Sequence, residues 1–166
     1  PEITYGFGLS MGFKNWDISC FFQGSARSSF FIDSEQIAPF NNPPSTTGSY
    51  TRKTALFQAI ADSYWSEEHR DAFWPRLSTE SIKNNTQVST WWMRDGSFMR
   101  LKSLELGYSF PQQMIKKIHL TKLRLYANGT NLLTFSKFKL WDPEMGGLGV
   151  GYPNQRVINL GIQVDF

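Results

Sequence analysis

The sequence is poor in the residues that build most metal, redox and nucleic-acid sites. Its 166 residues include one cysteine and two histidines, and this excludes an internal disulfide and a cysteine-rich metal site. The net charge is only +3, from 17 basic and 14 acidic residues, and no basic cluster is longer than Lys116-Lys117. Nucleic-acid binding needs a concentrated basic surface, so we expect no nucleic-acid partner, and the sequence gives no reason to expect a cofactor.

The chain also lacks long hydrophobic runs. No stretch approaches the roughly 18 apolar residues of a membrane-spanning helix, so none is predicted. The first residue is not Met, and Ile3 already lies in an alternating segment. We therefore expect this chain to be the C-terminal piece of a larger protein, in which case the absence of a signal sequence says nothing about location.

Arrangements that would support catalysis are missing as well. Asp142 and Glu144 lie beside Trp141, but their spacing does not place two carboxylates on either side of a substrate, as glycoside hydrolysis requires. The sequence around these two acids also lacks the regularly spaced oxygen ligands of a calcium-binding EF-hand loop. The glycine-rich stretch 146–151 does not join a strand to a helix, so we interpret it as a loop and not a phosphate cradle. We expect no enzyme activity.

Aromatic residues, in contrast, are abundant. They make up 16% of the chain, with 14 Phe, 6 Trp and 6 Tyr. Two kinds of structure account for such a content: interfacial girdles on a membrane barrel, or stacking platforms for sugars.

Five segments alternate between apolar and polar residues, which is typical of strands with one apolar face. The last segment is the clearest, because its even-numbered residues Ile158 to Phe166 are all apolar. In the segment 98–110 the apolar positions change from odd-numbered to even-numbered residues midway. We therefore expect a bulge near Ser103, or an upper half of this strand that stands clear of lipid. The predicted strands cover residues 3–11, 16–24, 98–110, 122–135 and 157–166.

The connections between these segments alternate in length. Residues 12–15 and 111–121 form short connections, whereas 25–97 and 136–156 are long. Outer-membrane barrels have short periplasmic turns and long outer loops, and a soluble sandwich does not segregate its loops in this way. The sequence therefore predicts an all-β fold: the last five antiparallel strands of a transmembrane β-barrel, incomplete and without a plug, with two long extracellular loops.

Several short motifs in the second half resemble one family, the SusC/RagA branch of TonB-dependent transporters. Their order and spacing extend over about 100 residues. The motifs are Trp65-Ser66-Glu67-Glu68, Trp74-Pro75-Arg76-Leu77-Ser78, Met93 to Lys102, Leu106 to Pro111, Leu123 to Tyr126, Gly129 to Phe135, Asp142-Pro143-Glu144, Tyr152-Pro153, Arg156, Leu160-Gly161 and Phe166. A whole transporter of this kind has about 22 strands and a plugged lumen. Five strands alone should therefore not transport anything.

The resemblance implies that the intact protein sits in the bacterial outer membrane and imports bulky nutrients, either oligosaccharides or peptides. It further implies a SusD-like surface lipoprotein as a lid, energy from the TonB complex through an N-terminal region that this chain lacks, and strands in contact with outer-membrane lipid. The alternating end of the last strand would serve as a signal to the barrel-assembly machinery. The residues of that signal are Leu160, Ile162, Val164 and Phe166.

Four tryptophans in the longer loop are candidate ligand or partner contacts. Trp91 and Trp92 could stack on a sugar, but neighbours on a strand point opposite ways, so at most one of them can do so. Trp65 and Trp74 flank a possible helix, and packing inside a folded loop is the competing interpretation for all four. The alternative for the whole chain is a secreted carbohydrate-binding β-sandwich, which should be soluble without detergent.

Overall fold

The computed structural model describes residues 1–37, 56–78 and 82–166, which form two compact units. The sheet unit comprises Pro1–Ser28, Gly96–Lys137 and Asn154–Phe166. The loop unit comprises Ser29–Asp95 and Phe138–Pro153. Each unit is described by itself below.

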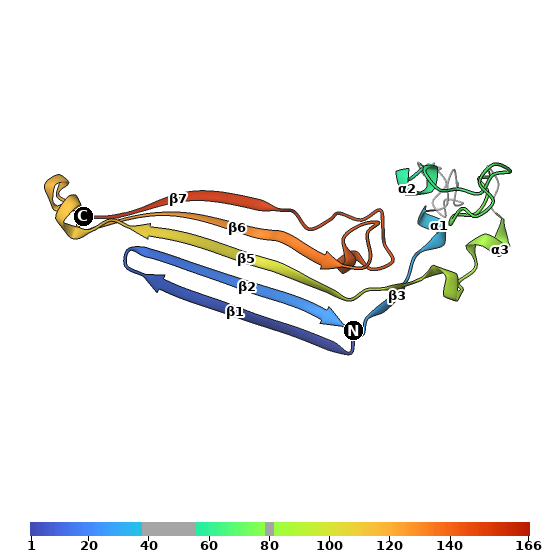
Figure 1. Cartoon of the computed structure of the whole chain (residues 1–166), viewed down its shortest axis with the longest axis horizontal. Helices are drawn as coiled ribbons and strands as arrows, with labels where there is room; N and C mark the ends of the chain where they lie inside the picture. Colours follow the sequence, from blue (N-terminus) through green and yellow to red (C-terminus); the bar gives the residue numbers. More distant parts are fainter. Residues whose placement is uncertain (38–55, 79–81) are drawn as a thin grey trace, which may run out of the picture. The chain divides into compact units, whose positions relative to one another are not determined.

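The sheet unit is one antiparallel sheet of five long strands (Figure 1). Its order is β1-β2-β5-β6-β7, so strands that are neighbours in the unit's chain order are also neighbours in space. The strands are β1 (Ile3–Phe13), β2 (Trp16–Ala26), β5 (Phe98–Ser109), β6 (Lys122–Ser136) and β7 (Val157–Asp165). The predicted all-β class, with five antiparallel strands in sequential order, is confirmed.

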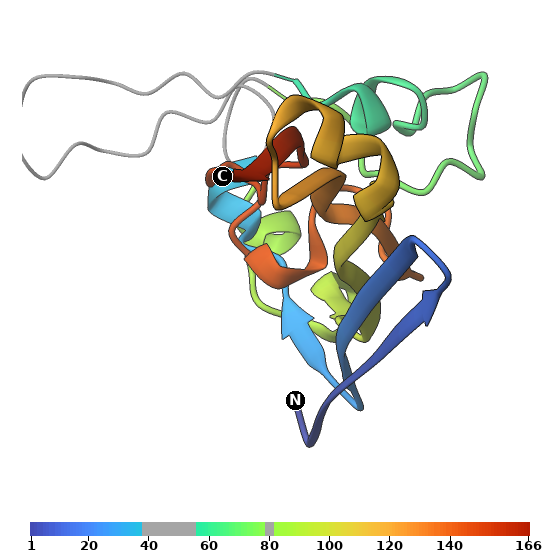
Figure 2. The same cartoon turned by 90° about the vertical axis from the view of Figure 1, so that its left-hand side faces the viewer.

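The short connections all lie at one end of this sheet. Lys14 and Asn15 join β1 to β2, and α4 (Gln112–Ile115) with the 3-10 turn η2 (Lys116–Ile118) joins β5 to β6. Figure 2 views this end, with the β1–β2 hairpin and the coil of α4 toward the reader. At the opposite end, where Ser25 pairs with Phe98 and Phe98 with Ser136, the chain leaves for the loop unit. The predicted segregation of short and long connections is therefore confirmed.

The strand register gives the sheet one polar and one apolar face. Two transverse rows, each with one residue from every strand, show the contrast, because residues in register across strands project to the same side. A polar row consists of Ser10, Ser19, Glu105, Asn128 and Asn159. The adjacent apolar row consists of Met11, Ile18, Leu106, Ala127 and Leu160.

A bulge keeps the apolar face continuous where the sequence changes phase. On β5, Leu101 and Ser103 pair with Phe22 and Phe21, which are adjacent, so Lys102 is an extra residue. One extra residue reverses the numbering parity of a strand without moving its side chains to the other face. The predicted bulge near Ser103 is thus confirmed. Strand β6 has its own irregularity here, and Asn131 takes a left-handed conformation with φ of 53°.

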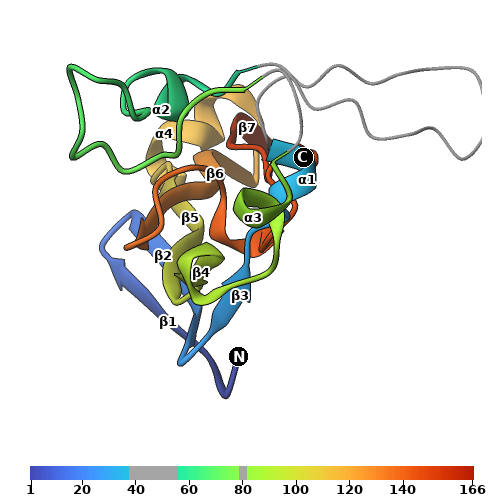
Figure 3. The ribbon, with the colours of Figure 1, turned by 90° about the vertical axis from the view of Figure 1, so that its right-hand side faces the viewer.

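The loop unit contains short elements around a small aromatic core. Its two-stranded antiparallel sheet pairs β3 (Ser29–Phe31) with β4 (Met93–Asp95), side by side in Figure 3. The helical turns are α1 (Ser34–Ile37), α2 (Gln58–Ala61), α3 (Lys83–Thr86), η1 (Thr90–Trp92) and η3 (Pro143–Met145). Turns α1 and α3 are neighbours, as Figure 3 shows. The Ser34 hydroxyl of α1 donates a hydrogen bond to the Thr86 carbonyl of α3.

Two further observations concern the alternatives for the chain. Apart from the five-stranded sheet, the described residues form the short β3–β4 pair and one isolated bridge between Tyr64 and Trp74, which are too small to be the second layer of a sandwich. The structure therefore does not support the β-sandwich alternative. Separately, none of the described helices has the length and apolar content needed to cross a membrane.

Candidate functional site

Three tryptophans contact one another in the loop unit. The ring centroids of Trp91 lie 4.6 Å from those of Trp92 and 5.4 Å from Trp74, both in edge-to-face geometry. Trp74 and Trp92 are only 5% and 6% exposed, and they belong to the core with Ile32, Ile37, Ile60 and Phe138. Burial of these two indoles stabilises the unit, so both are primarily core residues.

The expectation that Trp91 and Trp92 lie on a strand is wrong. Both lie in the 3-10 turn η1, directly before β4, so they do not alternate across a sheet. The Trp92 indole Nε1 donates to the Asn85 carbonyl at 3.1 Å, which fixes it in the core. Trp91 is half-buried and stacks on the exposed ring of Phe73, with centroids 5.1 Å apart. Of the pair, Trp91 is therefore the one with accessible surface.

Trp65 and Trp74 do not flank a helix, contrary to the prediction. The chain between them forms a closed loop, in which Trp65 N donates to Trp74 O at 2.9 Å and Trp74 N donates to Ser63 O at 2.9 Å. A tight turn from Ser66 to His69 lies within this loop. The segment between the two tryptophans consists of turns and bends and contains no helix. Trp65 is half-buried.

Arg94 on β4 is a feature of this cluster that sequence reasoning missed. Its guanidinium carbon lies 5.3 Å from the Phe73 ring centroid and 5.4 Å from that of Trp91. Its Nη1 donates to the Met93 carbonyl at 2.9 Å and also to the Trp91 carbonyl, whereas Nη2 is buried without a partner among the described residues. Burial lowers the pKa of the Arg94 guanidinium. Through cation–π contacts with Trp91 and Phe73, the Arg94 guanidinium thus holds η1 against the Trp65–Trp74 loop.

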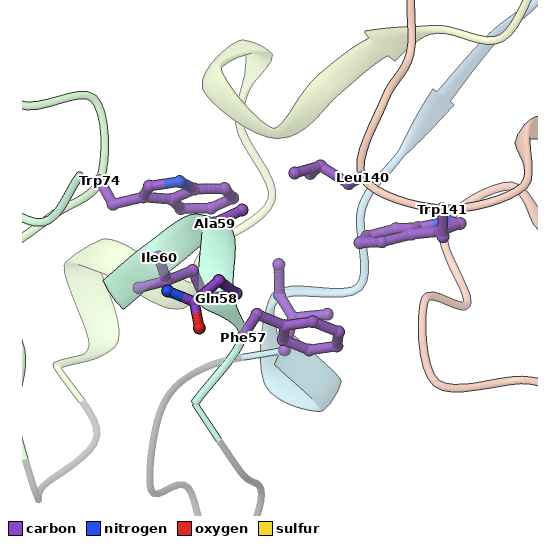
Figure 4. A pocket seen from close by; sticks show the side chains of 8 residues that line it. Phe57, Gln58, Ala59, Ile60, Trp74, Leu140 and Trp141 are labelled. Carbon is purple, nitrogen blue, oxygen red and sulfur yellow. The ribbon is translucent and has the colours of Figure 1, made fainter. Parts of the chain in front are cut away.

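A pocket of about 140 Å³ opens beside this core (Figure 4). It lies where α2 and the residue before it meet the chain after β6. Figure 4 shows the Trp74 and Trp141 indoles on opposite sides of it, with Leu140 near Trp141. The lining residues are Ile37, Phe57, Gln58, Ala59, Ile60, Trp74, Leu140 and Trp141. All but Gln58 are apolar or aromatic, so the pocket selects apolar groups.

The acidic residues singled out in the sequence have a structural role. The Asp142 side chain accepts a hydrogen bond from Glu144 N at 3.0 Å and caps η3, which Pro143 starts. An aspartate followed by proline suits the start of such a turn. In the part of the chain that is described, no three His, Cys, Asp or Glu side chains gather as a metal site would require.

A charged network spans three strands on the polar face of the sheet unit. Arg124 on β6 donates to Asp17 on β2 and to Glu105 on β5, the latter at 2.8 Å. Gly107 lies between them, and a Cβ there would stand 2.3 Å from Arg124 Nη2. Glycine is therefore required at this position for the arginine to cross β5. Sequence analysis did not identify this network.

The opposite face is apolar and largely exposed in the isolated chain. The four residues expected to signal barrel assembly lie on β7 or directly after it, with Leu160 84% exposed and Phe166 91% exposed. Ile162 and Val164 are exposed as well. Aromatic contacts mark the short-turn end, where Trp16 and Tyr108 centroids lie 4.8 Å apart and those of Tyr108 and Phe110 5.1 Å. A large exposed apolar face implies another apolar surface or lipid against it.

Curated proteins similar to this chain carry one description. TonB-dependent receptor P26 of Formosa agariphila is 31% identical over 179 residues, a match that covers 100% of this chain and 17% of the relative. TonB-dependent receptor P3 of the same organism is 28% identical over 180 residues, with 100% and 16% covered. The chain thus spans about a sixth of the length of the relatives that it matches. No protein-family model matches the sequence.

Solved structures agree with these relatives. The RagAB peptide importer in its open-open state matches 98% of this chain and 17% of the importer chain, at 26% identity and a TM-score of 0.67. Its closed-closed state matches the same shares at 28% identity and a TM-score of 0.68. The sheet is therefore a segment of the β-barrel found in such proteins. Sequence identity along the whole chain and the shared strand arrangement together show that this chain belongs to the TonB-dependent receptor family.

Proposed function

We propose that this chain forms the C-terminal part of a SusC/RagA-type transporter that imports bulky nutrients, oligosaccharides or peptides, across a bacterial outer membrane. The observation that carries the proposal is the match of 98% of the chain to a peptide importer, over sheet and loop units alike. The chain is a wall segment and no enzyme: its polar face lines the lumen and its apolar face contacts lipid. In membrane barrels, apolar residues that face lipid alternate along each strand with polar residues that face the lumen.

The chain by itself is not competent for transport in this proposal. Strands β1 and β7 each have a neighbour on one side only within the described sheet. Unpaired backbone groups are too costly in lipid, so the remaining barrel strands must cover both edges. Energy coupling to TonB belongs to the N-terminal region of the whole protein. The terminal apolar residues Leu160, Ile162, Val164 and Phe166 act as the barrel-assembly signal.

The loop unit forms part of the seat of a SusD-like lipoprotein lid. It is formed by the two long connections and has its own aromatic core, so it is a folded structure in its own right. Long loops that fold in this way usually carry function. Half-exposed Trp91, with Phe73 and Arg94 beside it, and Trp65 are its candidate contact residues, and tryptophan and arginine are frequent anchors of interfaces. Phe73 and Trp91 pack against the buried Trp74, and Trp91 also packs against the buried Trp92.

Co-purification of the lid with the intact receptor tests this proposal. Phe73→Lys with Leu148→Lys places two charges on exposed apolar positions of the loop unit, the first of them beside Trp91. Met114→Lys with Ile118→Lys does the same at the short-turn end of the sheet, at positions of similar exposure. We expect the first pair to release the lipoprotein and the second to retain it. Retention of the lid in both variants would place its seat on other loops.

A further inference from the structure

The pocket beside α2 has the size of one side chain. Its volume is about 140 Å³. An engineered protein cavity of about 150 Å³ with a similar apolar lining stays dry and accepts benzene. The space between Trp74 and Trp141 therefore fits a single phenyl or isobutyl group, and is too small for a whole sugar ring with its hydroxyls and their waters.

Two of the polar donors at the pocket are already engaged. The Gln58 amide Nε2 donates to Asp62 Oδ1 at 2.5 Å, and the Trp141 indole Nε1 donates to the Gly146 carbonyl at 2.8 Å. Sugar hydroxyls placed here would lose most of their bonds to water, because seven of the eight lining residues are apolar or aromatic, and each lost bond has a cost. An apolar group has no such loss. The pocket chemistry therefore disfavours oligosaccharide and favours a hydrocarbon side chain.

The surroundings of the pocket suit a peptide better than a broad protein interface. The core of a protein interface is a contiguous apolar patch. Among the described residues, none of the large hydrophobic side chains that are exposed lines this pocket. A single apolar pocket without such a patch matches the recognition of extended peptides, in which pockets hold individual side chains.

We propose that this pocket binds one leucine- or phenylalanine-sized side chain of an extended peptide, and so favours peptides as the cargo of the transporter. The inference rests on the proposed function and names the substrate class for this site.

Photo-cross-linking to the intact receptor tests it. The probe is acetyl-Gly-Gly-photoleucine-Gly-Gly-amide, with the Leu and Ser versions of the same peptide and maltohexaose as competitors. We expect label on residues 57–60 or 140–141, and competition about tenfold stronger by the Leu peptide than by the Ser peptide, as loss of one buried side chain predicts. Maltohexaose should not compete. Label elsewhere, or equal competition by the three compounds, would overturn the inference.

Two variants on one helical turn make the test specific. Ala59 is exposed and lines the pocket, whereas Ala61 lies on the same turn outside the lining. We expect Ala59→Leu to fill the pocket and reduce labelling about tenfold, and Ala61→Leu to leave it unchanged. If Ala59→Leu releases the lid and labelling stays unchanged, the pocket holds a side chain of the lid and the inference fails. If lid co-purification behaves as proposed but labelling misses the pocket, only this inference fails and the proposed function stands.

Discussion

Arg124 on β6 binds Asp17 on β2 across the whole width of β5. Its Nε lies 3.2 Å from Asp17 Oδ1 and its Nη2 lies 2.5 Å from Oδ2. The same Nη2 donates to Glu105, and the guanidinium carbon lies 5.2 Å from the Tyr126 ring centroid. Because paired charge-assisted bonds fix geometry as well as charge, this arginine ties three strands together independently of the backbone ladder.

The first prediction concerns the glycine over which this arginine passes. In Gly107→Ala the new Cβ would stand 2.3 Å from Arg124 Nη2 and 2.6 Å from the Asp17 carboxylate oxygens, so the pair must separate. We expect the folded receptor to lose about 2 kcal/mol of stability, the scale of a charge-assisted hydrogen bond. The measurement is the temperature at which the folded band disappears on gels, which should be lower in the variant. Gly12→Ala is the matched control, since its Cβ meets nothing nearer than 3.9 Å. Equal effects of both variants would contradict this account.

A second prediction separates the members of the network by charge. Arg124→Met leaves the Asp17 and Glu105 carboxylates near each other without their shared cation, whereas Asp17→Asn leaves Arg124 paired with Glu105. Two like charges without a partner cost more than one lost acceptor. We therefore expect Arg124→Met to destabilise the folded receptor by about 1 kcal/mol more than Asp17→Asn, in the same gel assay. The opposite order would show that the arginine contributes packing and little electrostatics.

The alternation of residues along one strand and the pairing of side chains across strands differ in how far the sequence predicts them. Alternation on β7 is a local property, so Ile158, Leu160 and Ile162 could be assigned to one face without knowledge of any partner strand. The pairing of Asp17 with Arg124 depends on the register of three strands, and the two residues are 107 positions apart. No local pattern encodes that register. The bulge at Lys102 was predictable because it leaves a phase change in a single strand.

The loop unit was harder to predict because its core draws on distant segments. Ile32, Trp74, Trp92 and Phe138 lie far apart in the sequence and pack together only when the unit closes. The tryptophans were recognised as candidate contacts, but their local structure was not predicted, since tertiary packing overrides local preference in short segments. The accessible ring of Trp91 and the cation of Arg94 against it followed from neither composition nor spacing.

The third prediction compares neighbouring tryptophans in η1. Trp92→Ala removes a core indole and its hydrogen bond to Asn85, so we expect a loss of about 3–5 kcal/mol in the stability of the loop unit. Trp91→Ala removes a half-buried ring and should cost clearly less. Limited proteolysis of the intact receptor measures this, with cleavage confined to residues 29–95 and 138–153. If Trp91→Ala opens these segments as readily as Trp92→Ala, the division into core and surface indoles is wrong.

The final prediction concerns Phe166, whose side chain is 91% exposed next to the apolar face of β7. We propose that this aromatic is read by the barrel-assembly machinery and does more than pack in lipid. Phe166→Ala in the intact receptor should lower the amount of heat-modifiable barrel in the outer membrane severalfold, while synthesis is unchanged. Phe13→Ala is the matched control, because Phe13 is another strongly exposed aromatic, 71% exposed, at the short-turn end of β1. Loss of a lipid-contacting ring is common to both variants and costs at most about 3 kcal/mol, so packing alone predicts similar effects. A selective loss of Phe166→Ala from the membrane supports recognition, whereas equal levels of the two variants would assign Phe166 to packing.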